Sequence, residues 1–197
     1  MKFKNYLEQI PSWPESGKHV MAQFDDTSII VYQAYRHEIA DFAVQHQYFG
    51  GPFSYNRMSW IKPNFLWMMF RSGWAQKPGQ ERILALRIKR PFFDELLKSA
   101  VSSSLDLNTY PTHTAWQQAV QDSDVRLQWD PDHDPAGLCV ERRAVQLGLR
   151  GDALRRYGRE EMLEITDITA FVEQQRQHVQ LLEKLIIPHE EVYTSIW

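Results

Sequence analysis

The sequence has almost no cysteine and no long hydrophobic run. Its 197 residues include a single cysteine, Cys139, so no internal disulfide can form. A lone thiol is typical of proteins that work in a reducing cytosol. No apolar stretch reaches the roughly 18 residues that a membrane-spanning helix needs, and the first residues lack the apolar core of a signal peptide. We therefore expect a cytoplasmic protein with no membrane partner.

The motifs that mark several common enzyme classes are also missing. The chain has no P-loop, no GxGxxG fingerprint and no GxSxG elbow. His37-Glu38 begins like the zinc-protease motif HExxH, but Asp41 stands where the second histidine is needed. No internal repeat and no low-complexity tract is present. The function must therefore be inferred from the distribution of charge and aromatic residues.

The composition is that of one ordinary globular domain. Hydrophobic residues make up 43% and charged residues 24% of the chain, values typical of a folded, water-soluble protein. Strand-like and helix-like segments follow one another without a strict βαβ rhythm, so the sequence predicts an α+β fold over residues 1–197. We expect a mixed or antiparallel sheet of about five to six strands, flanked by helices.

Residue patterns place the individual elements. Runs of β-branched and aromatic residues predict strands, and apolar residues at helical spacing predict helices. The expected strands cover 28–35, 57–61, 82–89, 125–129, 145–149 and 162–165, and the expected helices cover 36–47, 64–74, 91–100 and 152–158. Residues 1–19, with Pro11, Pro14 and Gly17, are expected to be an irregular lead-in. An apolar stripe predicts a long C-terminal helix over 167–187 that docks on the domain.

Basic residues concentrate in one part of a chain whose net charge is only -3. From Arg57 to Pro91 there are eight basic residues against one acidic residue, Glu81. Arginine outnumbers lysine in this stretch, and Trp60, Trp67 and Trp74 are interleaved. Guanidinium groups next to aromatic planes suit a ligand that combines phosphate with a base. The alternative is a solvated face whose charges pair with the acidic remainder of the chain.

Part of this stretch is predicted to form one wall of a cleft. Trp67, Arg71 and Trp74 are spaced i, i+4, i+7, so a helix would place them on one face. We expect them to line the main cleft, with Arg57 or Lys62 near its mouth. The alternative is a core edge whose arginine extends to solvent.

The densest group of potential metal ligands is an acidic segment. Asp130, Asp132, Asp134 and Glu141 match positions 1, 3, 5 and 12 of a calcium-binding loop. Pro135 occupies the sixth position, where the turn needs glycine because proline cannot adopt a positive φ. We expect 130–135 to be a loop whose carboxylates pair with arginines or backbone amides, and we predict no tightly bound metal. The alternative is a divalent ion held by two of the carboxylates.

Four sequence blocks resemble a widespread family catalogued as a domain of unknown function. They are Val31–Tyr35, Met58–Trp74 (MSWIKPNFLWMMFRSGW), Leu127–Pro135 (LQWDPDHDP) and Arg142–Gly151 (RRAVQLGLRG). The family brings no established activity with it.

The order of elements also resembles that of ADP-ribosyltransferase-like domains. The strand that ends at Arg36, the helix to Gln47, the glycines at 50–51, the Ser59 strand and the helix to Trp74 follow that order. The Ser-Thr-Ser motif of those domains is absent. Tyr-Gln-Ala-Tyr also stands in the first strand, where Tyr-Arg-Gly would be expected.

The second resemblance implies an enzyme that acts on a nucleotide or nucleic acid, and more specifically an NAD-consuming ADP-ribosyltransferase. Arg36 or Tyr32 would stand at the first functional position, Ser59 would fix the nicotinamide ribose, and Glu164 would stabilise the oxocarbenium-like sugar. The implied catalytic residues are Arg36, Ser59 and Glu164, and the implied cofactor-binding residues are Tyr32, Trp60, Lys62, Trp67, Arg71 and Trp74. The alternative is a non-catalytic nucleotide- or nucleic-acid-binding module that uses residues 57–90. A third hypothesis, a partner-binding domain, requires the C-terminal stripe to be exposed.

Overall fold

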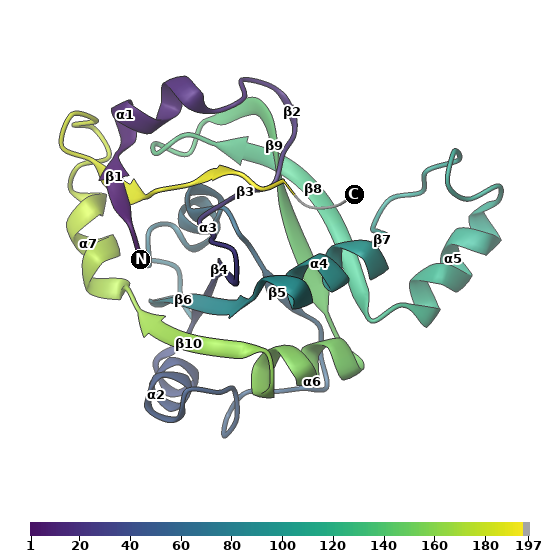
Figure 1. Ribbon diagram of the computed structural model, residues 1–197. Helices are drawn as coiled ribbons and strands as arrows, with labels where there is room; N and C mark the ends of the chain where they lie inside the picture. Colours follow the sequence, from purple (N-terminus) through teal and green to yellow (C-terminus); the bar gives the residue numbers. More distant parts are fainter. Residues whose placement is uncertain (195–197) are drawn as a thin grey trace.

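The computed structural model describes residues 1–194, which form an α+β fold (Figure 1). The larger sheet is mixed, with the order β2-β9-β8-β7 and β5 paired to β9, so its size is within the predicted range. A second, antiparallel sheet with the order β10-β6-β4 was not predicted as a separate unit. The strands of the larger sheet are β2 (Gly17–Lys18), β5 (Ser59–Ile61), β7 (Val101–Ser102), β8 (Val125–His133) and β9 (Cys139–Leu149). The strands of the three-stranded sheet are β4 (Ser28–Tyr35), β6 (Arg82–Lys89) and β10 (Met162–Asp167).

The three-stranded sheet is apolar on both faces, because successive residues of a strand point to opposite sides. On β4, Ile29 and Val31 pack into a core shared with the larger sheet. Ile30 and Tyr32 pack into a second core on the other face. The central strand is β6, whose middle residues are apolar on both faces.

Most of the helices cover these cores. The helices of the described chain are α1 (Tyr6–Gln9), α2 (His37–His46), α3 (Phe65–Ser72), α4 (Arg90–Ser99), α5 (His113–Asp122), α6 (Gly151–Arg159) and α7 (Thr169–Arg176). The helices α4 and α6 contribute to the core between the two sheets, whereas α3 and α7 close the second core. The helix α5 has no buried residue and projects from the body of the molecule (Figure 1).

The helix α3 begins and ends at residues with clear physical roles. The Asn64 side chain caps it by accepting the Trp67 backbone N–H at 2.6 Å. Gly73 ends it in the left-handed conformation, with φ 60° and its N–H bonded to the Met69 carbonyl. Six of the eight residues between these caps are buried, so the helix is fixed firmly in the core.

The prediction of a loop over 130–135 was wrong in its first part, because β8 continues to His133. Proline lacks an N–H and is tolerated in a strand only where no partner needs one. Beyond Leu127, β8 is paired with β9 on one side, and β7 no longer lies on the other. Pro131 therefore stands on a free strand edge.

The long C-terminal helix predicted over 167–187 was also wrong. The helix α7 stops at Arg176, and hydrogen-bonded turns carry Val179, Leu182 and Leu185 to the same core. The buried Gln175 side chain accepts the Ile186 N–H at 2.8 Å, which directs the chain into β11 (Ile186–Pro188). The apolar stripe is therefore real, but successive turns present it instead of one helix.

The N-terminal residues are not the irregular lead-in that the sequence predicted. They form β1 (Phe3–Asn5), α1 and a 3-10 turn (Ile10–Ser12), followed by β2 and β3 (Met21–Ala22). The strand β1 pairs with β11, and β3 pairs with β12 (Glu191–Val192). Pairing with distant strands, which local composition does not reveal, orders this segment. Within residues 1–194, no helix is long and apolar enough to cross a membrane.

Candidate functional site

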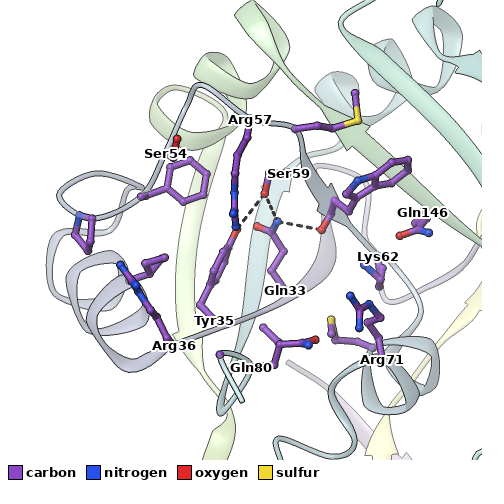
Figure 2. A pocket seen from close by; sticks show the side chains of 18 of the residues that line it. Gln33, Tyr35, Arg36, Ser54, Arg57, Ser59, Lys62, Arg71, Gln80 and Gln146 are labelled. Carbon is purple, nitrogen blue, oxygen red and sulfur yellow. Dashed lines mark hydrogen bonds between the residues drawn. The ribbon is translucent and has the colours of Figure 1, made fainter. Parts of the chain in front are cut away.

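A cavity opens where the two sheets separate. The residue after β5, Lys62, is joined to β4 by a backbone bridge with Tyr32, with N···O distances of 2.7 and 3.3 Å. Next to this bridge lies a cavity of about 780 Å³ that residues of both strands line (Figure 2). This volume is in the usual range for small-molecule sites. Strands β4, β5, β8 and β9, the helix α3 and the loops 52–58 and 78–80 all contribute to its wall.

The lining is polar and carries charge of one sign. Arg36, Arg57, Lys62 and Arg71 reach the cavity from four different segments (Figure 2). Among the described residues, no aspartate or glutamate lines it. The remaining polar groups are neutral: Gln33, Tyr35, Ser54, Ser59, Gln80, Gln128 and Gln146. A concave site with four cations and no lining carboxylate produces a positive potential that attracts anions.

Lys62 is the buried cation of the site. Its residue is only 5% exposed, yet its ammonium makes no ion pair or hydrogen bond with any residue in 1–194. Burial, together with the nearby Arg71 guanidinium, lowers the pKa of Lys62 from 10.5 to about 8, although the Asp130 carboxylate acts in the opposite direction. A buried charge without a direct ion pair is costly, so an anion bound in the cavity would stabilise this ammonium.

The three arginines differ from Lys62 because all are exposed. Arg57 and Arg71 form no salt bridge within the described chain, and Arg36 pairs only with the exposed Glu38, at 3.4 Å. A guanidinium group presents several N–H donors in a planar fork that matches the oxygens of a phosphate or carboxylate. Arg57 and Arg71 can therefore receive an anion at the rim without first losing an internal partner.

A hydrogen-bond network holds the wall between the two sheets. Gln33 is buried, and its amide donates to Ser59 Oγ at 2.8 Å and to the Trp60 carbonyl at 3.0 Å. Tyr157 donates its hydroxyl to Gln33 Oε1 at 2.8 Å, and Tyr35 and Ser59 share a hydrogen bond of 3.1 Å. The Ser59 hydroxyl therefore has a fixed position across the gap from β4 (Figure 2).

The aromatic part of the wall depends on one glycine. Gly148 on β9 lies opposite Trp60 on β5. A Cβ on Gly148 would come within 2.6 Å of the Met58 sulfur and 3.0 Å of the Trp60 ring. The absence of a side chain at this position therefore lets the Trp60 ring lie against β9 beside the cavity.

The structure brings five of the nine predicted site residues together. Arg36, Ser59, Trp60, Lys62 and Arg71 all line the cavity. They come from segments that are separate in the sequence and meet only because β4, β5 and α3 converge. Arg57, one of the two residues expected near the mouth of the cleft, is exposed and lines the cavity as well.

The other predicted cofactor-binding residues lie in the core. Tyr32 is fully buried and packs edge-on against Phe65. Trp67 is 7% exposed and stacks on His133 of β8. Trp74 is 9% exposed, and its indole donates to the Pro135 carbonyl at 3.2 Å. None of the three lines the cavity.

The expectation that Trp67, Arg71 and Trp74 share one wall fails for a local reason. The left-handed turn at Gly73 ends α3 before Trp74, so Trp74 does not continue the helical face. Trp67 lies one helical turn before Arg71, and its ring stacks on His133 at the end of β8. Only Arg71 therefore reaches the cavity.

Glu164 lies away from the other predicted catalytic residues. It stands on β10, exposed, opposite Arg87, whose Nε is 3.2 Å from its carboxylate. The cavity lies at β4, and β6 separates β4 from β10 in the three-stranded sheet. The structure therefore brings Arg36 and Ser59 to one cavity without Glu164.

Two of the three aspartates of the acidic segment have the kind of partner that the sequence predicted. Asp132 is fully buried, pairs with Arg142 at 2.7 Å and accepts the His133 N–H at 2.8 Å. Asp134 accepts the Leu138 N–H at 2.9 Å. Asp130 instead accepts two glutamine amides, which the sequence did not predict. In the described part of the chain, no three histidine, cysteine or acidic side chains are grouped to hold a metal ion.

Sequence reasoning missed the neutral residues of the site. Gln33, Gln80, Gln128 and Gln146 come from four separate segments and form no motif. A weak signal was present only at Gln33, which interrupts an otherwise apolar strand; β8 and β9 contain several other polar residues, so Gln128 and Gln146 do not stand out in them. A polar residue inside a buried strand often indicates a site.

Together, the fold and the cavity define an α+β protein with a cationic site at the junction of two sheets. The chain belongs to the family described as domain of unknown function (DUF4291), which matches residues 19–193. The predicted membership of a family of unknown function is thereby confirmed. A comparison with curated proteins finds no match.

Proposed function

We propose that the cavity binds a nucleotide through its phosphate groups. The observation that carries the proposal is the buried, unpartnered Lys62 ammonium in a cavity that no described carboxylate lines. Phosphate oxygens would supply the missing charge at Lys62. Arg71, Arg57 and Arg36 can donate paired hydrogen bonds to a phosphate at the rim.

The dimensions and the aromatic wall favour a nucleotide over a bare phosphate. The cavity of about 780 Å³ is far larger than a phosphate ion and has room for a nucleoside as well. Tyr35, Phe53 and Trp60 contribute rings to its lining. Aromatic faces of this kind stack on bases without requiring a particular one.

We predict that Arg71→Ala weakens nucleotide binding by at least about tenfold, because it removes a charged contact to phosphate. Calorimetric titration with ADP and with pyrophosphate measures the loss for each ligand. Arg143→Ala, which removes an exposed arginine of β9 outside the cavity, is the matched control and should bind as the wild type does. Equal affinities for the Arg71 and Arg143 variants would contradict the proposed site.

A nucleic acid would use the same charges in a different way. A polymer would contact the exposed arginines and further basic residues, so its affinity would fall steeply with salt concentration. Competition between ADP and a short single-stranded oligonucleotide separates the two ligands. The enclosed Lys62 favours the mononucleotide, and we therefore expect ADP to displace the oligonucleotide from the cavity.

The second candidate function is NAD-consuming transfer, as the resemblance to ADP-ribosyltransferase-like domains implies. It is supported by Arg36 and Ser59, which line one cavity although 23 positions separate them in the chain. In such a transferase, Ser59 would hold the nicotinamide ribose and the arginines would hold the pyrophosphate of NAD. The carboxylate of Glu164 would have to act from outside the cavity.

If the protein is an NAD-consuming transferase, the wild-type protein should release nicotinamide from NAD. The Ser59→Ala variant should then release much less. The Glu164→Gln variant tests the catalytic glutamate separately. If release occurs and is unchanged in Glu164→Gln, Glu164 does not belong to the catalytic set. Absence of release by the wild type, with binding of NAD retained, would leave a nucleotide-binding module.

A further inference from the structure

Two glutamines on the floor of the cavity are held in one orientation by an aspartate. Gln128 on β8 and Gln146 on β9 are direct cross-strand neighbours. Asp130, two residues after Gln128 on the same face of β8, accepts Gln128 Nε2 and Gln146 Nε2, each at 2.7 Å. Each amide therefore uses one oxygen of the same carboxylate.

This arrangement fixes which end of each amide points away from Asp130. An ionised carboxylate only accepts hydrogen bonds, so both NH₂ groups must face it. The two carbonyl oxygens are left without a partner among residues 1–194, and both side chains are half-buried in the cavity lining. Gln146 lines the cavity together with Lys62 and Arg71 (Figure 2). The floor therefore offers two hydrogen-bond acceptors in a cavity otherwise rich in donors.

We propose that Gln128 and Gln146 select a ligand that carries an NH₂ group on a planar unit, such as an amino-substituted base or a carboxamide. Two acceptors match the two N–H donors of such a group. A ligand with an oxo group at that position would face two carbonyl oxygens with no hydrogen between them. Asp130 acts as a positioning residue, because it orients the glutamines without lining the cavity. The inference rests on the proposed nucleotide binding and names its substrate class.

Pairs of nucleotides that differ at a single group test this selection. AMP and IMP differ by an amino against an oxo group on the base, and NAD and nicotinic acid adenine dinucleotide differ by a carboxamide against a carboxylate. We expect the NH₂-bearing member of one pair to bind at least about tenfold more tightly, because a site with fixed acceptors rejects the analogue that lacks the donor. The pair that shows the preference identifies whether a base or a carboxamide occupies the floor.

Variants then assign the preference to the glutamines. In Asp130→Asn the carboxylate no longer fixes the amides, and in Gln146→Met one acceptor is lost with little change in shape. Each should reduce the preference to about threefold or less, while pyrophosphate, which has no NH₂ group, still binds. Its retention shows that the variants are folded and that the cationic site is intact.

The inference is overturned if the wild type binds both members of both pairs equally or prefers the oxo and carboxylate members. It is also overturned if the preference survives in both Asp130→Asn and Gln146→Met. Failure of pyrophosphate and all four nucleotides to bind the wild type would instead refute the proposed function itself. The two failures are therefore distinguishable.

Discussion

The Lys62→Met variant should be more stable than the wild-type protein at neutral pH, by as much as about 3 kcal/mol. The pKa of Lys62 is about 8 in the folded chain against an ordinary value of 10.5, because burial and Arg71 disfavour the ammonium. Holding the charged form in the folded protein therefore costs free energy at pH 7. Methionine has a similar length and needs no counter-ion.

The pH dependence of this gain has a definite sign. Between pH 8 and 10.5 the unfolded chain binds more protons than the folded one, so wild-type stability rises with pH across this window. The advantage of Lys62→Met should therefore be full at pH 7 and mostly lost at pH 10. Urea unfolding at both pH values measures it, with the exposed Lys98→Met on α4 as the matched control. A Lys62→Met variant that is less stable than wild type at pH 7 would show that the ammonium has a partner after all.

The effect of Lys62 on anion binding should be opposite to its effect on stability. Because an anion stabilises charged Lys62, wild-type affinity for pyrophosphate should fall as pH rises through about 8. Lys62→Met should bind pyrophosphate weakly, with no comparable pH dependence. The same residue would then lower the stability of the free protein and raise its affinity for an anion.

The second large effect concerns the buried ion pair between Asp132, near the end of β8, and Arg142 on β9. We expect Asp132→Ala to destabilise the protein by about 3 to 5 kcal/mol, because Arg142 would remain buried without its counter-ion. Asp132 is fully buried, and Arg142 is 4% exposed. Arg142 also donates to the Pro14 carbonyl at 2.7 Å and lies 5.1 Å from the Trp13 ring centre. The pair therefore fastens the N-terminal segment to β9.

A double variant separates the loss of the Asp132–Arg142 attraction from the cost of leaving the Arg142 charge buried without a counter-ion. Asp132→Ala combined with Arg142→Met removes both charges and should be less destabilised than Asp132→Ala alone. Urea unfolding of the three proteins at pH 7 measures both effects. A double variant less stable than Asp132→Ala would mean that packing of Arg142, rather than its charge, dominates.

Two strands of the three-stranded sheet, β4 and β6, were predictable because they are largely buried on both faces. Ser28–Tyr35 and Arg82–Lys89 have the predicted bounds, since dense β-branched and aromatic residues leave little ambiguity. The helix α5 was not predictable in this way, because it buries no residue and so has no apolar stripe. It is held by Thr112, which caps it, and by Trp116, whose indole donates to the Ser102 carbonyl at 2.9 Å.

For the site, the sequence predicted the positive charge of the cavity lining better than its geometry. The excess of cations over 57–91 is visible in the composition, and Arg57, Lys62 and Arg71 do meet in one cavity. Periodicity could not show that α3 ends at Gly73 and turns Trp74 away. Nor could it show that Glu164 stands on the far strand of its sheet, because strand order depends on long-range pairing.

The pairing of the first strands with the last ones affects how the chain is made. Phe3 on β1 pairs with Pro188 on β11, and Met21 on β3 pairs with Val192 on β12. A ribosome releases the N-terminal strands long before it synthesises their partners. Both strands must therefore stay unpaired until residues 186–192 have been synthesised and have left the ribosome. Closing such distant contacts is slow, so this pairing should be a late folding step, before which the nascent protein exposes unpaired strand edges to chaperones.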